Sequence, residues 1–194
     1  GSRLIVEDKI KDEFLAKVMA IGQKMMPGDP LDPKTQMGAM VDETQTKRVM
    51  GYIDAGQKEG AKLAMGGKQV HIDNAGSFIE PTVFDNVDNK MKIAQEEIFG
   101  PVLSVIPVKD AEQALTVAND TIYGLASAIF TSDINKAFKF SKALRAGSVW
   151  VNTYDGGDIT TPFGGYKQSG NGRDKSLHAF DKFTQMKTTW IQLG

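Results

Sequence analysis

The sequence predicts an α/β protein built around a parallel sheet. After residue 108, extended apolar runs alternate with helical stretches, which is the pattern of βαβ units. The most glycine-dense and least periodic stretch, residues 152–173, directly follows the last of these predicted strands. Ligands of such sheets bind where the strands end, so this loop is a candidate binding region. Its glycines also suit ordinary turns, which are their commonest use.

The first half of the chain is predicted to contain two amphipathic helices among short extended runs. Apolar residues recur at helical spacing from Ile10 to Met25, and Pro27 ends that helix. In the second helix we expect Val49 and Ile53 to face the core. The expected elements are a strand at 3–7, a helix from residue 8, a helix at 43–60, a strand at 62–65, and extended runs at 78–84 and 102–108.

The second half is predicted to be more regular. Asp110 and Gln113 have the spacing of a capping box, and Ser132 is expected to cap the helix that follows it. The expected elements are helices at 110–119 and 133–144 and strands at 125–131 and 148–152.

Composition excludes several classes of function. The 194 residues suffice for one domain with a sizeable core, and their 41% apolar and 24% charged content is ordinary for a globular protein. A net charge of −1 gives no reason to expect nucleic acid or an anionic membrane as a partner. No apolar run is long enough to span a bilayer and no signal-peptide pattern is present, so a cytoplasmic or organelle-matrix protein is expected.

Cysteine is absent, which removes disulfides, thiolate metal sites and any thiol nucleophile from these residues. The histidines, His71 and His178, lie far apart in the sequence. A histidine-based metal cluster is therefore not expected, and we predict no metal site. Any chemistry of this chain alone must use carboxylates, amines, hydroxyls or backbone amides.

The most informative short segment is residues 96–101, Glu-Glu-Ile-Phe-Gly-Pro, just before the apolar run 102–108. A carboxylate here can accept both hydroxyls of a ribose, and Phe99 can pack against a flat heterocycle. The alternative is that both acids form a solvated helix end and Phe99 belongs to the core. The chain has no glycine-rich phosphate-binding motif, so the segment would hold only part of a dinucleotide.

Several segments, in order, resemble the NAD(P)-dependent aldehyde dehydrogenase superfamily. The resemblance runs from one end of the chain to the other, which makes an accidental match very improbable. The segments are Gly-Ser-Arg-Leu-Ile-Val at 1–6, Gln-Glu-Glu-Ile-Phe-Gly-Pro-Val at 95–102, Asn-Asp-Thr-Ile-Tyr-Gly-Leu at 119–125, Gly-Ser-Val-Trp-Val-Asn at 147–152, and Pro-Phe-Gly-Gly-Tyr-Lys-Gln-Ser-Gly at 162–170 with Gly-Arg at 172–173.

The resemblance implies the C-terminal part of a Rossmann-like catalytic domain, residues 1–180, followed by an oligomerisation strand, residues 181–194. It implies that Glu97 binds the nicotinamide ribose of NAD or NADP and that Phe99 lies beside the nicotinamide. Family members attack a small aldehyde with a cysteine thiolate, pass hydride to the cofactor and hydrolyse the resulting thioester. This favours the ribose-binding interpretation of residues 96–101.

The family's nucleophile is expected just before Gly1, and its general-base glutamate and phosphate-binding region further upstream. No catalytic residue is therefore expected within the chain, and the chain alone is predicted to be inactive. The alternative is a freestanding, non-catalytic binding or oligomerisation module, which the absence of cysteine would also suit.

The resemblance places residues 152–163 along the substrate tunnel, with Asp155, Gly157, Asp158 and Phe163 as its candidate residues. Relatives that prefer simple aldehydes have larger apolar residues where this chain has Gly157 and Asp158. This loop is most similar to that of γ-glutamyl-γ-aminobutyraldehyde dehydrogenases, whose substrate carries an ammonium group that Asp158 or Asp155 would suit. The alternative is that Asp158 is a solvated loop acid.

The last segment, residues 182–193, is rich in Thr, Trp and Ile and is predicted to be a long strand. In the family such a strand pairs with another subunit, which implies a homo-oligomer. Many relatives have an acid where Gln185 stands, so an ion pair at that position is not expected here.

Overall fold

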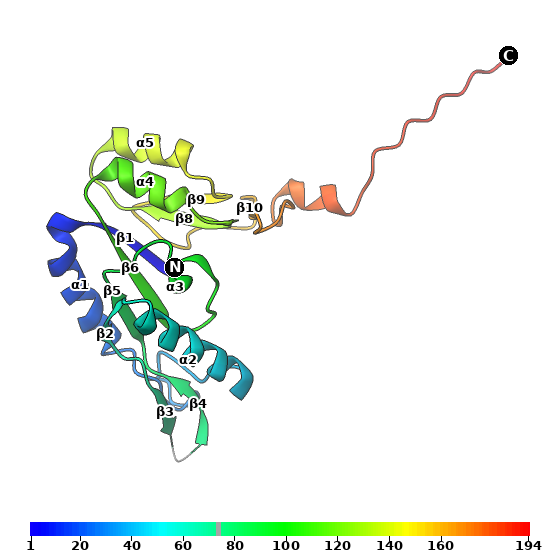
Figure 1. The fold of residues 1–194 in the computed structure, drawn as a ribbon. Helices are drawn as coiled ribbons and strands as arrows, with labels where there is room; N and C mark the ends of the chain where they lie inside the picture. The colour runs from blue at the N-terminus through cyan, green and yellow to red at the C-terminus, as the bar shows by residue number, and fades with distance from the viewer. Residues whose placement is uncertain (73–74) are drawn as a thin grey trace. The chain divides into compact units, whose positions relative to one another are not determined.

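The computed structural model describes residues 1–72 and 75–194. The chain forms two compact units, Gly1–Asp120 and Thr121–Gly194, each with its own sheets (Figure 1). The boundary expected after residue 180 stays a prediction.

The first unit is built on a four-stranded sheet of order β1-β6-β5-β2. Its strands are β1 (Arg3–Glu7), β6 (Val102–Val108), β5 (Thr82–Asp85) and β2 (Lys62–Met65). Both β1 and β5 run parallel to β6, whereas β2 is antiparallel to β5. The sheet is therefore mixed, and the prediction of a purely parallel sheet is corrected. The chain returns from β2 to β5 through a hairpin of β3 (Gln69–Ile72) and β4 (Ala75–Ile79), without the crossover helix that parallel pairing requires.

Helices cover both faces of this sheet. Val105 of β6 packs with Leu15 of α1 (Asp8–Gly22), while its neighbour Ile106 belongs to the cluster that contains Val49 and Ile53 of α2 (Glu43–Lys58). Because side chains alternate along a strand, one strand supplies both clusters. The expected inward orientation of Val49 and Ile53 is confirmed, since both are fully buried.

Other expectations for the first unit need correction. The apolar stripe of α1 is largely exposed, because the helix packs through Leu15 and its neighbours Val18 and Met19. The extended run at 78–84 is divided between β4 and β5 at Pro81, which has no N–H for a strand ladder. The short helix α3 (Lys92–Gln95) was not expected. Asp110 does cap α4 (Ala111–Asn119), since its side chain accepts the backbone N–H of Gln113 at 2.9 Å.

A largely buried ion pair ties α1 to the end of β5. Lys11 Nζ lies 3.0 and 2.9 Å from the two carboxylate oxygens of Asp85, and the side chains are 13% and 5% exposed. Asp85 also accepts its neighbour's backbone N–H, from Asn86, at 2.8 Å. The hydrogen bond to Asp85 raises the pKa of Lys11 above its usual value.

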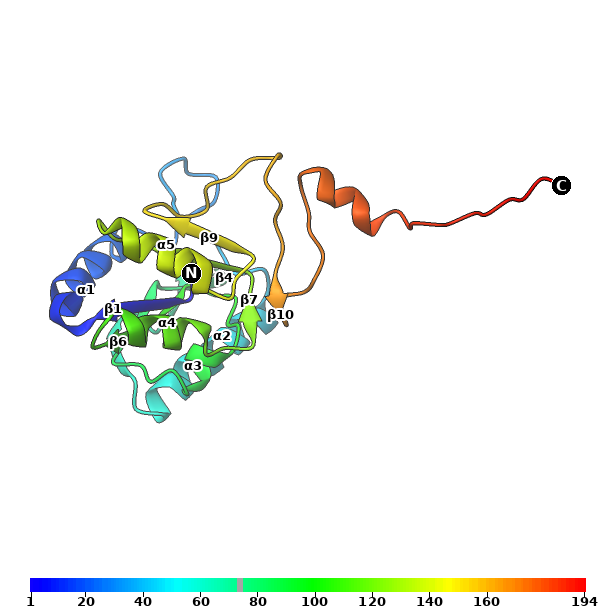
Figure 2. The same ribbon diagram turned by 90° about the horizontal axis from the view of Figure 1, so that it is seen from above.

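The second unit contains the predicted βαβ arrangement. Strands β8 (Ala126–Ile129) and β9 (Ser148–Val151) pair in parallel, and α5 (Ile134–Ala143) connects them and packs against β9 (Figure 2). Asp133 caps α5, so the cap predicted at Ser132 is wrong by one residue. A second, antiparallel pair joins β7 (Tyr123–Gly124) to β10 (Tyr166–Lys167).

The strand predicted at residues 182–193 does not form within this chain. After the 3-10 helix η1 (Leu177–Lys182), residues 183–194 have no regular structure (Figure 2). The Trp190 side chain is 90% exposed. A strand is stabilised by hydrogen bonds to a neighbouring strand, and β propensity alone does not replace them.

We predict that Lys11→Met lowers the free energy of unfolding by about 2–3 kcal/mol, because it leaves the Asp85 carboxylate buried without its cation. Urea unfolding followed by circular dichroism measures the change.

The matched control is Lys17→Met on the same helix, which removes only the exposed ion pair with Glu13 and should cost less than about 1 kcal/mol. The raised pKa of Lys11 means that its contribution is complete below the unfolded value near 10.5 and is lost as the pH rises through the folded value. Equal losses in the two variants at pH 7 would contradict the prediction.

Candidate functional site

Residues 96–101 lie between α3 and β6, at the edge of the sheet where the parallel strands begin. Pro101 accepts the backbone N–H of Thr82, the first residue of β5, and Ser2, next to the start of β1, accepts the N–H of Ser104. The segment and the first residues of the chain therefore share one edge of the sheet. This is the opposite edge from the one at which ligands of such sheets usually bind.

The two adjacent acids of this segment have different environments. Glu96 accepts a hydrogen bond from the Tyr52 hydroxyl at 2.8 Å, and Lys92 Nζ lies 3.9 Å from the same oxygen. Glu97 is exposed, and no described residue contacts its carboxylate, although its backbone carbonyl faces Arg48 at 3.5 Å. Glu97 is thus the acid that remains available to a ligand.

Phe99 does not belong to the core, so the alternative interpretation of its ring is wrong. Its side chain is 69% exposed, while its neighbour Ile98 is 3% exposed and joins the core of the first unit. Gly100 then lies directly against α2, where a Cβ would stand 2.6 Å from Val49 Cγ2. The backbone thus places Ile98 and Gly100 inward and the Phe99 ring outward.

Gln45 of α2 is a contributor that sequence reasoning missed. Its side-chain amide donates to the carbonyls of Ile98 at 2.9 Å and Phe99 at 3.0 Å. The only local signal was its position three residues after Asp42, whose carboxylate accepts the Gln45 backbone N–H at 2.7 Å. Nothing in that spacing indicates a partner more than fifty residues away.

A partly buried polar network anchors both the start of the chain and the end of α3. Arg3 donates to Asn89 Oδ1 at 3.0 Å and to the last turn of α4, and Asn89 donates to Asp120 at 2.9 Å. Gln95, which precedes Glu96, donates to the carbonyl of Asn89 at 2.5 Å. Burial lowers the pKa of Arg3, and the charge of Asp120 opposes that change.

The predicted substrate loop of the second unit leaves the carboxyl end of β9, as expected. Asp155, Gly157 and Asp158 are exposed, and Asp155 has a left-handed backbone with φ of 58°. Trp150 Nε1 donates to the Gly156 carbonyl at 2.6 Å, which ties the loop to the strand. Phe163 is half-buried and exchanges backbone hydrogen bonds with Asp174.

Asp158 is held in a tight turn. One of its oxygens accepts the Thr160 hydroxyl at 2.5 Å and the Thr160 backbone N–H at 2.7 Å. These hydrogen bonds, with a smaller contribution from the charge of Lys175, lower the pKa of Asp158. The carboxylate is therefore ionised at neutral pH and its charge is exposed to solvent.

Close backbone contacts require glycine at two positions, one just before β9 and one within the loop. A Cβ on Gly147 would overlap the carbonyl oxygen of Gly164, and a Cβ on Gly164 would overlap the carbonyl oxygen of Gly172. These glycines pack segments together, so the glycine density at residues 152–173 is partly structural.

In the described part of the chain, no three or more His, Cys, Asp or Glu side chains are grouped so that they could hold a metal ion. None of the helices in residues 1–72 and 75–194 is long and apolar enough to cross a membrane.

The structure is that of an α/β protein in which the carboxylate of Glu97 and the ring of Phe99 are exposed at one end of the sheet. Comparison with known proteins identifies the family. The model of the aldehyde dehydrogenase family matches residues 1–189. The chain belongs to the aldehyde dehydrogenase family.

Individual proteins that the chain resembles are also named as aldehyde dehydrogenases. The NADP/NAD-dependent aldehyde dehydrogenase PuuC of Escherichia coli is 49% identical over 193 residues, which cover 100% of this chain and 38% of PuuC. A mutant of the indole-3-acetaldehyde dehydrogenase AldA of P. syringae, solved with NAD+ and IAA, is 60% identical with a TM-score of 0.95, covering 100% of this chain and 39% of AldA.

The γ-glutamyl-γ-aminobutyraldehyde dehydrogenase of Burkholderia cenocepacia is 55% identical with a TM-score of 0.93, covering 97% of this chain and 38% of the enzyme. The chain therefore spans about two fifths of the length of the relatives it matches.

Proposed function

We propose that Glu97 and Phe99 hold the nicotinamide-ribose end of NAD or NADP in the parent aldehyde dehydrogenase. The observation that carries this proposal is an exposed carboxylate that no described residue contacts, two residues from an exposed aromatic ring. AldA, at 60% identity, has been solved with NAD+, and the name of PuuC includes both NADP and NAD.

The chemistry of the two side chains fits this part of the cofactor. An ionised carboxylate accepts hydrogen bonds from both hydroxyls of a ribose, and such charge-assisted bonds are the stronger ones. The Phe99 ring packs against the flat nicotinamide and keeps water from one side of it. Glu96 suits this role less well, because Tyr52 and Lys92 already contact one of its carboxylate oxygens. The bound cofactor supplies the hydride acceptor.

We predict that Glu97→Gln in the parent enzyme raises the Kd for NAD+ about tenfold or more, because an amide oxygen accepts the ribose hydroxyls more weakly than a carboxylate. Fluorescence quenching on NAD+ titration measures the change. Glu96→Gln is the matched control and should stay within about twofold of wild type, since a glutamine can still accept from Tyr52. Unchanged binding by Glu97→Gln would overturn the proposal.

The 194 residues alone are proposed to be catalytically inactive. They contain no cysteine, so the thiolate that attacks the aldehyde in this family must come from outside them. They also lack a glycine-rich phosphate-binding motif.

We predict no heat of binding when the 194-residue chain is titrated with millimolar NAD+ in a calorimeter. Contacts to the nicotinamide end alone would leave the phosphates without partners. Circular dichroism of the same sample is the control for folding. Tight binding would contradict the proposal that another part of the enzyme holds the phosphates.

We further propose that the substrate is an amino-aldehyde such as γ-glutamyl-γ-aminobutyraldehyde, with Asp158 or Asp155 facing its ammonium group and Gly157 and Phe163 along the tunnel wall. The relative named for this substrate is 55% identical, but AldA, named for indole-3-acetaldehyde, is 60% identical. Overall identity therefore does not separate the two substrates. The exposed, ionised carboxylate of Asp158 supports the cationic one.

We predict that Asp158→Asn in the parent enzyme lowers kcat/KM for an amino-aldehyde by about fivefold relative to propanal, as expected for loss of one partly exposed charge pair. Steady-state rates with the two aldehydes measure this ratio, and propanal is the internal control because it carries no charge. Asp155→Asn tests the other acid of the loop. An unchanged ratio in both variants would rule out this substrate assignment.

Residues 182–193 are proposed to pair with strands of another subunit in the parent enzyme. Their exposed Met186, Trp190 and Ile191 would then be covered, and their backbone groups would gain partners. A homo-oligomer is the arrangement that this pairing predicts.

A further inference from the structure

Asn171 and Gly172 form an asparagine–glycine pair in the segment that follows β10. Every other asparagine of the sequence precedes a residue that has a side chain, so this pair occurs once. Glycine has no Cβ to shield its own backbone nitrogen, and its backbone turns easily. The asparagine side chain can therefore come close to that nitrogen, which is the geometry needed for a reaction between the two groups.

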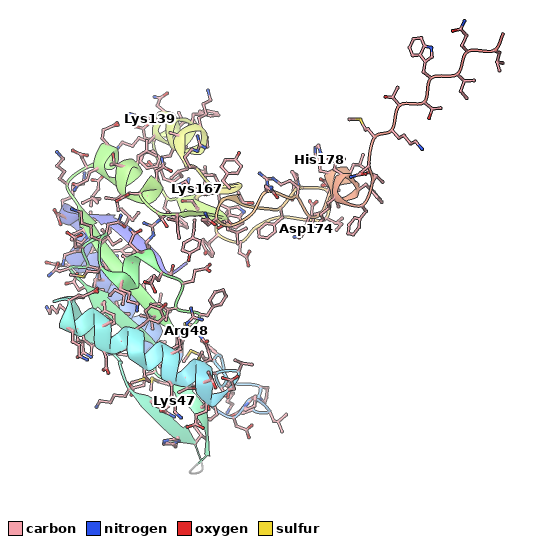
Figure 3. All side chains as sticks on the ribbon, turned by 45° about the vertical axis from the view of Figure 1, so that its right-hand side comes forward. Lys47, Arg48, Lys139, Lys167, Asp174 and His178 are labelled. Atoms are coloured by element: carbon pink, nitrogen blue, oxygen red, sulfur yellow. The ribbon has the colours of Figure 1, made fainter. Side chains whose placement is uncertain are left out.

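The structure leaves both groups accessible. Asn171 and Gly172 are exposed and lie outside regular structure, between Lys167 of β10 and Asp174 (both labelled in Figure 3). In the part of the chain that the structure describes, no residue forms a hydrogen bond with the Asn171 side-chain amide or with the Gly172 backbone N–H. Neither group is thus held away from the other by a bond to a third residue.

Two other asparagines show the opposite situation. The Asn152 side chain accepts the Thr131 backbone N–H at 2.8 Å and donates to the Thr131 carbonyl at 2.9 Å. The Asn89 side chain donates to the carbonyl of Asp120 at 2.9 Å. These hydrogen bonds restrain both side chains, and a threonine and a lysine follow them in the sequence. Asn152 and Asn89 are therefore internal controls for the chemistry of Asn171.

The reaction of such a pair is a ring closure followed by hydrolysis. The Gly172 backbone nitrogen attacks the Asn171 side-chain carbonyl carbon and loses its proton, and ammonia leaves, so that a five-membered cyclic imide forms. Water then opens the ring. Cleavage at the side-chain carbonyl gives aspartate, whereas cleavage at the backbone carbonyl gives isoaspartate, whose main chain runs through the former side chain. One water is consumed, one ammonia is released and one carboxylate is gained, with no change of oxidation state.

The residues after the pair are packed too closely to accept a longer main chain. The Gly172 carbonyl oxygen would stand 2.2 Å from a Cβ on Gly164, so the two backbones touch. Asp174 donates its backbone N–H to the Phe163 carbonyl at 2.6 Å and accepts the N–H of Phe163 at 2.8 Å. Isoaspartate adds one carbon to the main chain directly before these contacts. Their register cannot be kept without a shift of the segment.

We propose that Asn171–Gly172 is a site of spontaneous deamidation in the parent enzyme, and that the isoaspartate formed there loosens the backbone pairing of Asp174 with Phe163. No cofactor, metal or second enzyme is required, because water is the only co-reactant. The inference is independent of the roles proposed above for Glu97, Phe99 and Asp158.

The experiment ages the parent enzyme at mildly alkaline pH, which favours loss of the glycine N–H proton, and follows its peptides by mass spectrometry. Gly172→Ala is the matched variant. A Cβ at this position would meet only Lys182 Cδ, at 3.8 Å, so the loop can accept alanine while its methyl group hinders ring closure. Circular dichroism of the fresh proteins is the control for folding.

We expect the wild-type peptide that contains Asn171 to gain about 1 Da, because an amide becomes an acid. Its isoaspartate and aspartate forms separate on chromatography. The peptides that contain Asn152 and Asn89 should keep their masses. In Gly172→Ala, the modified fraction after the same time should be about tenfold smaller or less, since alanine restricts the approach of the two groups.

Hydrogen–deuterium exchange tests the effect on the loop. The backbone amides of Asp174 and Phe163 should exchange faster in the aged wild type than in the fresh protein, and aged Gly172→Ala should show no such change. Fresh Asn171→Asp should exchange as slowly as fresh wild type, because it adds the charge without lengthening the main chain.

Each part of the inference can fail separately. An unchanged mass of the Asn171 peptide, or equal modification in wild type and Gly172→Ala, overturns the deamidation site. Unchanged exchange at Asp174 and Phe163 in a deamidated sample overturns the loosening of the loop. Should Gly172→Ala not fold, Asn171→Gln replaces it, since a glutamine would have to close a six-membered ring, and modification as fast as in wild type then overturns the site.

Discussion

Burial of β6 on both of its faces is the constraint on which the first unit depends. Val105 and Ile106 are adjacent in the strand, yet each belongs to a different core cluster, one closed by α1 and the other by α2. A strand in this position needs a helix on each side. The packing of Val49 and Ile53 therefore fixes α2, and with it the polar residues on the edge of α2 that faces residues 96–99.

The segment before β6 places two neighbouring glutamates, Glu96 and Glu97, in different environments. Glu96 and Glu97 are neighbours, but the first accepts a hydrogen bond from Tyr52, whereas the described residues contact the second only at its backbone carbonyl. Glu97 is exposed and keeps its hydration, so its charge carries no desolvation cost. Phe99 has a left-handed backbone with φ of 53°, and this strain is offset nearby by the hydrogen bonds from Gln45 and the burial of Ile98.

In the loop after β9, hydrogen bonds between nearby residues hold an exposed carboxylate in place. Thr160 supplies two donors to one oxygen of Asp158, which hold the turn and lower the pKa of the carboxyl, and the charge of Lys175 contributes less. The glycines around it have a separate purpose, because Gly147 and Gly164 allow backbones to touch. Charge and chain path in this loop are therefore set by different residues. A substitution at Asp158 can change the charge while the close backbone contacts remain.

Much of the fold could be predicted from the sequence because it depends on local patterns. The bounds of β1, β2 and β6, the cap at Asp110 and the βαβ unit of β8, α5 and β9 follow from alternation, helical spacing and capping chemistry. The family segments are likewise a property of residue order. The strand expected at residues 182–193 did not form, because a strand depends on a partner that its own residues cannot supply.

The sequence by itself therefore determined the class of fold, the family and the candidate residues Glu97 and Phe99. Only the tertiary structure decided that Ile98 is buried while Phe99 is exposed, that Glu96 is held by Tyr52, and that Gln45 donates to carbonyls of this segment. The physical reason is distance along the chain. Hydrogen bonds between α2 and residues 96–99 join residues far apart in the sequence, and such contacts leave no periodicity or spacing from which to predict them.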